Sequence, residues 1–227
     1  MNIYCFAGPN GSGKSTIINQ FIEENAIDTL PFINADIISK EFFSDIEDEN
    51  KRNLMAAKFA EKKRHEMLEN KKDFIFETVL STPRNLEFLK LAKSTDPNIN
   101  ITTVYVVTNN SDINVERVKQ RVLEGGHNVP EDKIRSRYDR CFKILPDVIE
   151  VSDTALIYDN SESKPSLIIH KGCNNKIYVY SSSKFVDEKI LKPILATQQL
   201  DVVFNNGALD LLNESMFNLK TLSDLVK

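Results

Sequence analysis

The chain has 227 residues, of which 41% are hydrophobic and 27% are charged, the composition of a globular protein large enough to bury one core. Its net charge of −4 gives no general attraction to nucleic acid, so a small-molecule substrate is favoured over a nucleic-acid partner. No stretch approaches the ~18 apolar residues that a membrane span needs, and no signal-peptide pattern is present. We therefore expect a cytoplasmic protein without a membrane partner.

The first predicted elements enclose a glycine-rich motif. Residues 3–7 form an apolar run that predicts a buried strand, and residues 16–22 carry apolar side chains at helical spacing. Between them, Gly8–Ser15 matches the P-loop pattern G-x-x-x-x-G-K-[ST]. Such glycines let backbone N–H groups point at phosphate oxygens, and the following helix adds the positive end of its dipole. The motif therefore predicts a nucleotide-binding site.

The expected ligand is ATP or GTP together with Mg²⁺. Lys14 would reach the β- and γ-phosphates, and the Ser15 hydroxyl would ligate the metal. The other residues expected to contact the nucleotide belong to the loop and the start of the helix, namely Gly8, Pro9, Asn10, Gly11, Ser12, Gly13 and Thr16.

Strands and helices alternate along the rest of this part of the chain. Strands are predicted at 31–36, 73–77, 99–108 and 154–158, and helices at 50–70, 83–93, 112–123 and 131–145. This alternation predicts an α/β fold of the P-loop NTPase type, with a parallel sheet sandwiched by helices. Ligands of such sheets bind beyond the carboxyl ends of the strands, where the P-loop, Asp36 and Glu77 are expected to gather.

We interpret residues 1–161 as the P-loop core and residues 162–227 as a C-terminal elaboration packed on the same domain. Within the elaboration, residues 166–170 and 176–180 predict a β-hairpin, and apolar spacing predicts a helix at 208–226.

The three cysteines, Cys5, Cys141 and Cys173, are far apart in the sequence. They lack the spacing of a metal site, and we expect reduced structural thiols.

Two carboxylates end predicted strands beside the P-loop. Asp36 could accept the proton of an attacking hydroxyl or hold that hydroxyl in line with the γ-phosphate. The alternative is an N-cap for a helix beginning at Ile37. Glu77 could bind a substrate hydroxyl or a water molecule, or could be a strand-end residue satisfied by backbone.

The loop after Glu77 offers further substrate contacts. Thr78, Ser81 and Arg84 lie in or next to this loop and are predicted to bind substrate. Arg84 could equally be a surface residue in the first turn of the next helix.

Arginines gather on the two predicted helices on either side of a glycine break. Arg117 and Arg121 are four residues apart and share a helix face. On the next helix, Arg135 and Arg137 flank the apolar stripe, whereas Arg140 points away from it and is expected to be solvated.

This helix–glycine–helix arrangement predicts a mobile lid over the ATP phosphates, hinged at Gly125-Gly126. Arg121 and Arg137 are the predicted catalytic arginines, because a guanidinium group neutralises charge on the transferred phosphoryl group. His127 is either a substrate contact or a turn residue. In the alternative interpretation the arginines form ion pairs on solvated helix faces, with acidic partners at Glu116, Glu131, Asp132 and Asp139.

Several motifs occur together and in order over residues 1–161. Besides the P-loop, they are Ile33-Asn34-Ala35-Asp36, Phe76-Glu77-Thr78-Val79-Leu80-Ser81, Arg117 to Arg121, Gly125-Gly126-His127-Asn128-Val129-Pro130, Arg137-Tyr138 and Tyr158-Asp159-Asn160-Ser161. In this combination the chain resembles the zeta-toxin family of P-loop kinases.

The resemblance implies ATP-dependent phosphorylation of a hydroxyl, with UDP-N-acetylglucosamine as the substrate of the best-known members and an antitoxin protein as a partner. By motif, Asp36 looks like the base and Glu77 like a ligand of the substrate hydroxyl. One departure is Val79, which stands where the E-T-T-L-S motif of the family has its second threonine. This difference removes a hydroxyl.

The sequence thus predicts a kinase that transfers the γ-phosphoryl group of ATP to an alcohol group of a small molecule, for instance a UDP-sugar. Two alternatives stay open. A nucleoside or polynucleotide kinase would need the arginine lid to continue into a basic groove. A nucleotide-dependent switch ATPase would act through a protein partner docked on residues 162–227.

Overall fold

The computed structural model describes residues 1–172, 176–181, 183–197 and 201–204. The helix predicted at 208–226 and the thiol of Cys173 lie outside the described residues.

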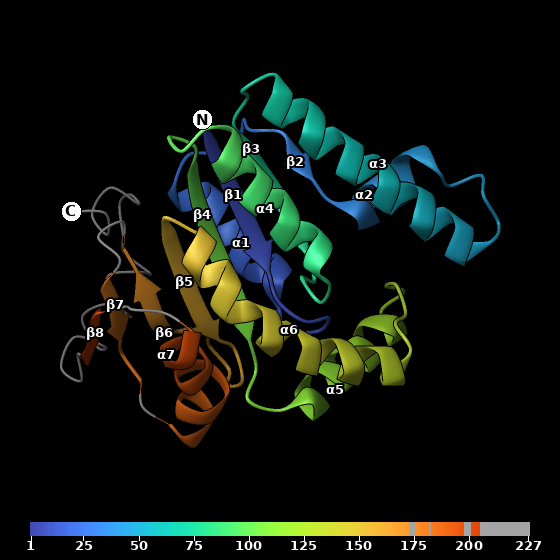
Figure 1. Cartoon of the computed structure of the whole chain (residues 1–227). Coiled ribbons are helices and arrows are strands. Elements are labelled where there is room, and N and C mark those ends of the chain that lie inside the picture. Colours follow the sequence, from blue (N-terminus) through green and yellow to red (C-terminus); the bar gives the residue numbers. More distant parts are fainter. Residues whose placement is uncertain (173–175, 182, 198–200, 205–227) are drawn as a thin grey trace.

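One sheet runs through the described chain in the order β2-β3-β1-β4-β5-β6-β7-β8 (Figure 1). The strands β2, β3, β1, β4 and β5 are parallel, β6 is antiparallel to both of its neighbours, and β8 is parallel to β7. The predicted α/β fold and the β6–β7 hairpin are therefore confirmed. The strands are β1 Asn2–Ala7, β2 Phe32–Ile33, β3 Phe74–Thr78, β4 Asn100–Val107, β5 Thr154–Asp159, β6 Ser166–Lys171, β7 Lys176–Val179 and β8 Asp201–Phe204.

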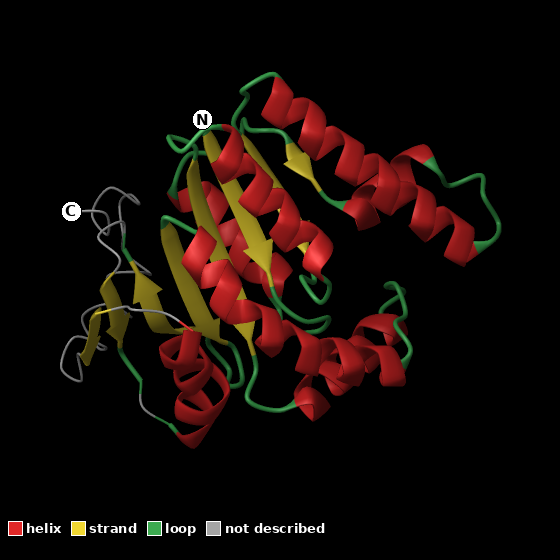
Figure 2. Ribbon diagram, viewed as in Figure 1, coloured by secondary structure: helices red, strands yellow, loops and turns green. Residues whose placement is uncertain are grey.

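Helices cover both faces of this sheet (Figure 2). The α2–α3 pair lies at the β2 edge, and α5 packs against α6 (Figure 1). None of the helices in the described part of the chain combines the length and apolar character that a bilayer-spanning helix needs. The helices are α1 Lys14–Glu24, α2 Ala35–Phe42, α3 Glu49–Glu69, α4 Pro83–Thr95, α5 Ser111–Leu123, α6 Glu131–Val151, the π-helical segment η1 Val186–Leu191 and α7 Lys192–Thr197.

The alternation of side chains along the strands divides the core into two layers. On β1, Ile3 and Cys5 belong to the cluster that includes apolar residues of α4 and α6. Phe6 points to the opposite face and joins the cluster formed with Ile17 and Phe21 of α1. Because each strand has a period of two, one apolar run supplies both layers, and the sheet is buried on both faces.

The helix predicted to end at Leu145 continues through Pro146 to Val151. The buried Lys171, the last residue of β6, contacts the carboxyl end of this helix. The Lys171 Nζ donates to the carbonyl oxygens of Ile149 at 2.9 Å and Ser152 at 2.6 Å. A cation in this position satisfies carbonyl groups that the helix leaves unpaired and interacts favourably with its dipole.

Candidate active site

The P-loop forms a tight cradle between β1 and α1. Gly8, Gly11 and Gly13 have φ of 140°, 77° and 89°, and Gly13 immediately precedes the first residue of α1. The Ser12 side chain is buried, and its Oγ has no hydrogen-bond partner. A helix N-terminus and an unpaired hydroxyl inside a glycine loop fit the oxygen atoms of a phosphate chain.

Neighbouring backbone leaves no room for side chains at two of these glycines. A Cβ atom added at Gly8 would lie 2.1 Å from the carbonyl oxygen of Val106, and one at Gly11 would lie 2.4 Å from that of Asn114. Gly125, in the lid, also has a positive φ of 83°, but a Cβ atom there would meet nothing within 4 Å. A substitution at Gly125 therefore measures the cost of backbone strain alone, without the steric overlap expected at Gly8.

We expect Gly8→Ala to lower the free energy of unfolding by more than about 2 kcal/mol, because it adds an overlap with backbone to the strain of a positive φ. Gly125→Ala should cost about 1 kcal/mol from strain alone. Urea denaturation followed by circular dichroism measures both. Equal losses in the two variants would contradict the close approach of Gly8 to β4.

The helices α5 and α6, which correspond to the predicted lid, hold the P-loop from one side. The Asn114 amide of α5 donates to the carbonyl oxygen of Asn10 at 2.7 Å. From α6, Arg137 Nη1 donates to Asn10 Oδ1 at 3.0 Å. Arg137 thus lies beside the phosphate loop, as a catalytic arginine must, whereas the role of Asn114 had no signal in the sequence.

The end of β5 holds the loop from the other side. The Asn160 amide donates to the carbonyl oxygen of Ser12 at 2.8 Å. Arg117 Nη1 in turn donates to the carbonyl oxygen of Asn160 at 2.8 Å. The loop conformation is therefore fixed by side chains from three separate elements.

Lys14 is buried and folds back over the loop. Its Nζ donates to the carbonyl oxygens of Gly8 at 2.9 Å and Pro9 at 3.1 Å, and lies 3.9 Å from Glu77 Oε1. Burial lowers the pKa of Lys14, and the charge of Glu77 opposes that shift. The two carbonyl groups are neutral partners that an anionic phosphate could replace.

Asn34 and not Asp36 caps α2, which corrects the alternative interpretation of Asp36. The Asn34 Oδ1 accepts from the backbone N–H groups of Asp36 at 2.7 Å and Ile37 at 3.2 Å. The Asp36 side chain is exposed and lines a cavity that Asn10 of the P-loop also lines, the main cavity of the site. Its carboxylate is therefore not engaged in capping.

Glu77 lies between the P-loop lysine and the α2 cap. The Asn34 amide donates to Glu77 Oε2 at 2.5 Å, and Lys14 Nζ lies 3.9 Å from Oε1, so both oxygens of this carboxylate have side-chain neighbours. Its side chain is 18% exposed, and burial raises its pKa, opposed by the charge of Lys14. Asp36 adds to the rise in the pKa of Glu77 by repulsion.

Asn34→Ala should lower the free energy of unfolding by about 1 kcal/mol or more, since it removes the cap of α2 and the donor to Glu77. Asn50→Ala, an exposed position in the first turn of α3, should change it by less than about 0.5 kcal/mol. Thermal and urea unfolding compare the two variants. A loss in Asn34→Ala no larger than in the control would argue against the double role of Asn34.

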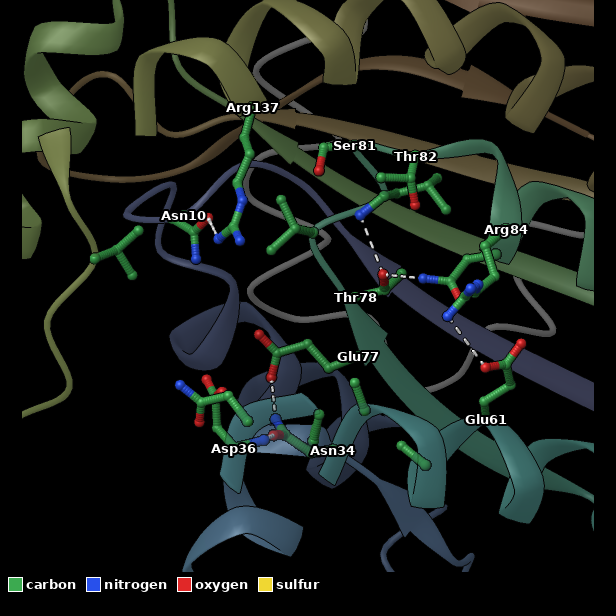
Figure 3. Close-up of a pocket in the computed structure, with 18 of the residues that line it drawn as sticks. Asn10, Asn34, Asp36, Glu61, Glu77, Thr78, Ser81, Thr82, Arg84 and Arg137 are labelled. Carbon is green, nitrogen blue, oxygen red and sulfur yellow. Dashed lines mark hydrogen bonds and ion pairs between the residues drawn. The ribbon is translucent and has the colours of Figure 1, made fainter. Parts of the chain in front are cut away.

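Asn34, Asp36 and Glu77 line the main cavity, which has a volume of about 460 Å³ (Figure 3). Figure 3 shows Asn34, Asp36 and Glu77 together, Asn10 with Arg137 on one side of the pocket, and Arg84 with Glu61 on the opposite side. The predicted site residues that line the cavity are Asn10, Asp36, Glu77, Thr78, Ser81, Arg84 and Arg137.

The side chains predicted to contact the substrate differ in their burial and in the hydrogen bonds or ion pairs that they form. The Thr78 hydroxyl accepts from the Asn85 amide at 2.5 Å and so helps to build the wall. Ser81 is buried, although it lines the cavity, and Val79 lines the cavity as well. Arg84 is 64% exposed and forms an ion pair with Glu61 at 3.4 Å.

The remaining lid arginines separate into distinct groups. Arg121 does not line the main cavity, and its Nη2 donates to the carbonyl oxygen of His127 at 2.7 Å. Arg135 forms ion pairs with Asp112 at 2.6 Å and Glu131 at 2.8 Å, as in the alternative interpretation of solvated faces. Arg140 is exposed as predicted, and it also lines the cavity.

His127 connects the lid to the opposite side of the cavity. Its Nδ1 lies 2.9 Å from Oε1 of Glu49, the first residue of α3. His127 and Val129 both line the cavity. The loop between α5 and α6 therefore lines the cavity and contacts the first residue of α3.

An Asn-Lys-x-Asp pattern of the guanine-reading type occurs at residues 70–73 but lies away from the P-loop. The Asp73 Oδ1 accepts from the backbone N–H of Asn2 at 2.7 Å, at the start of β1. The P-loop follows the opposite end of the same strand. This run therefore has a structural role in joining β1 to β3.

The fold and the site define a protein with a P-loop kinase-like domain. Residues 3–143 match the model of the AAA_33 family, described as an AAA domain, and the chain belongs to this family. An uncharacterized protein of Haemophilus influenzae is 31% identical over 137 residues, covering 60% of this chain and 89% of that protein.

Two solved structures with a similar fold come from complexes or paired systems. The AvrRxo1-ORF1:ORF2 complex with ATP matches with a TM-score of 0.63 at 13% identity, over 97% of this chain and 76% of that chain. The PezAT chromosomal toxin-antitoxin system of Streptococcus pneumoniae matches with a TM-score of 0.53 at 13% identity, over 99% and 87%. At these identities the similarity shows the fold.

Proposed function

We propose that this protein is an ATP-dependent kinase that transfers the γ-phosphoryl group to a hydroxyl of a small molecule. One observation carries the proposal: the P-loop, through Asn10, and the carboxylates Asp36 and Glu77 line a single cavity. A phosphoryl donor and an acceptor hydroxyl could therefore meet there.

The nucleotide half of the site is the P-loop. In the proposed complex the backbone of Gly8–Gly13 and the start of α1 bind the phosphates, and Lys14 exchanges its two carbonyl partners for phosphate oxygens. Ser15, exposed in the first turn of α1, would hold the Mg²⁺ that accompanies ATP and neutralises phosphate charge. The similar AvrRxo1 complex was solved with ATP, which supports this choice of nucleotide.

The acceptor half is formed by the strand-end carboxylates and the loop after β3. Asp36 accepts the proton of the acceptor hydroxyl as the hydroxyl oxygen bonds to the γ-phosphorus and ADP leaves. Glu77 orients that hydroxyl, and its contacts to Asn34 and Lys14 hold it in place. Thr78, Ser81 and Arg84 complete the substrate side.

The lid supplies positive charge to the transferred group. Arg137, beside Asn10, is placed to neutralise the γ-phosphoryl oxygens in the transition state. Arg121 contributes its positive charge without lining the cavity, while its Nη2 donates to the carbonyl oxygen of His127.

At a finer level we propose a zeta-toxin-like cytoplasmic enzyme, with a UDP-sugar as one acceptor to test and an antitoxin as one protein to test. The combination of motifs supports this proposal. So do the two similar structures, since one is a complex of two proteins and the other belongs to a toxin-antitoxin system. We further propose that residues 1–161 form the kinase core and that residues 162–227 pack on it as one domain.

The proposal is tested by incubating the protein with ATP, Mg²⁺ and a pool of metabolites, followed by mass spectrometry. A product about 80 Da heavier than a pool component, formed only with ATP, is the expected result of phosphoryl transfer. ATP consumption without any such product would favour the switch ATPase.

A further inference from the structure

Arg64 of α3 is a buried cation in the wall of the main cavity. It is 6% exposed, and its guanidinium carbon lies 5.3 Å from the ring centroid of Phe76 and 5.6 Å from that of Phe88. Its Nη2 donates to Asn85 Oδ1 at 2.9 Å, while its Nε is buried without a hydrogen-bond partner. Part of the guanidinium group is thus left unsatisfied.

No carboxylate in the described part of the chain lies within ion-pair distance of Arg64. The neighbouring acid, Glu61, is paired with Arg84 at 3.4 Å. The Cys5 thiol also faces Arg64, but burial raises the pKa of Cys5 to about 12 and keeps it neutral. Burial lowers the pKa of Arg64, yet a guanidinium remains protonated at physiological pH. A buried charge without a counter-charge is energetically unfavourable, and the two aromatic rings offset only part of that cost.

The surroundings of Arg64 fix its orientation. The guanidinium rests against two rings and is held by Asn85, whose own amide donates to the Thr78 hydroxyl. A planar, pre-oriented guanidinium suits bidentate binding of an oxyanion and loses little conformational entropy when one binds. Arg140 lines the same cavity and adds positive charge.

We propose that Arg64 is the anchor of an anion subsite, so that the acceptor carries a phosphate or carboxylate group besides the hydroxyl that is phosphorylated. This inference rests on the proposed kinase function for its identification of the cavity as the acceptor site. In this arrangement the oxyanion binds Arg64 at one wall, and the reactive hydroxyl reaches Asp36 and Glu77. Uncharged sugars and free nucleosides would lack the anchoring group.

The test first saturates the P-loop of the wild-type protein with Mg²⁺ and a non-hydrolysable ATP analogue, and then adds inorganic phosphate or acetate while following the melting temperature. We expect a concentration-dependent rise with at least one of the two anions, and the more effective anion indicates the class of the anchoring group. In Arg64→Gln the apparent anion affinity should fall at least about tenfold, with the affinity for the analogue unchanged.

The matched control is Lys62→Gln, which removes one positive charge from the same helix at a side chain that is 76% exposed. It should respond to the anions like the wild type. An equal response in Arg64→Gln and the wild type, or none in the wild type, would overturn the subsite. Failure of the wild type to bind the analogue would instead contradict the ATP site and is read separately.

A crystallographic measurement covers the case in which Arg64→Gln does not fold. Crystals of the wild-type protein with the analogue are soaked in selenate, whose selenium gives an anomalous signal. A peak within hydrogen-bond distance of the Arg64 guanidinium supports the subsite. A saturating soak that leaves this wall of the cavity empty overturns it.

Discussion

Lys14→Ala is expected to abolish ATP-dependent turnover and to weaken ATP binding while the fold stays intact. The ammonium group contacts two loop carbonyls and Glu77, so its removal takes little from the core. Burial also lowers the pKa of Lys14, which means that the ligand-free protein holds this charge at a cost. Calorimetric titration with ATP, a turnover assay and circular dichroism measure the three quantities.

The control for this change is Lys58→Ala, which removes an exposed lysine from α3. It should bind and turn over ATP like the wild type. Unchanged turnover in Lys14→Ala would refute the assignment of the P-loop as the ATP site.

Asp36→Asn should keep the affinity for ATP near the wild-type value and lower phosphoryl transfer by roughly 10²–10⁴-fold, the usual contribution of a general base. The side chain is not the cap of α2, so the change should leave the stability of the protein almost unaffected. Parallel ATP titration and a single-turnover transfer assay measure binding and chemistry separately.

Asp45→Asn, an exposed acid after α2, provides the charge-matched control and should transfer at the wild-type rate. Intact transfer in Asp36→Asn would refute the catalytic role of this carboxylate. Lost ATP binding would refute its assignment to the acceptor and would point to a role beside Mg²⁺.

The central part of the site could be predicted because it follows from strand ends. The P-loop pattern fixed the cradle, and parallel strands bring their carboxyl ends to one edge, so Asp36 and Glu77 were expected beside it. The capping role of Asn34 was not expected, because a cap can belong to any of several adjacent polar residues. Because Asn34 caps α2, Asp36 does not have the capping role that the sequence also allowed.

The part that Arg64 and Arg140 take in lining the cavity could not be predicted. Arg64 lies among charged residues on a helix with no dominant apolar face, and its burial arises only when α3 meets Phe76 and Phe88. Arg140 is exposed as expected, but the apolar stripe of α6 did not indicate that this part of the helix also borders a cavity.

The destination of the γ-phosphoryl group is the quantity that most directly separates a kinase from a switch ATPase. In a single-turnover reaction with ATP labelled in its γ-phosphate, Mg²⁺ and a small-molecule fraction, we predict that the label passes to an organic acceptor in the wild-type protein, and that Asp36→Asn greatly slows this transfer. Label that appears only as inorganic phosphate, at the same rate with and without the fraction, would contradict the proposed kinase.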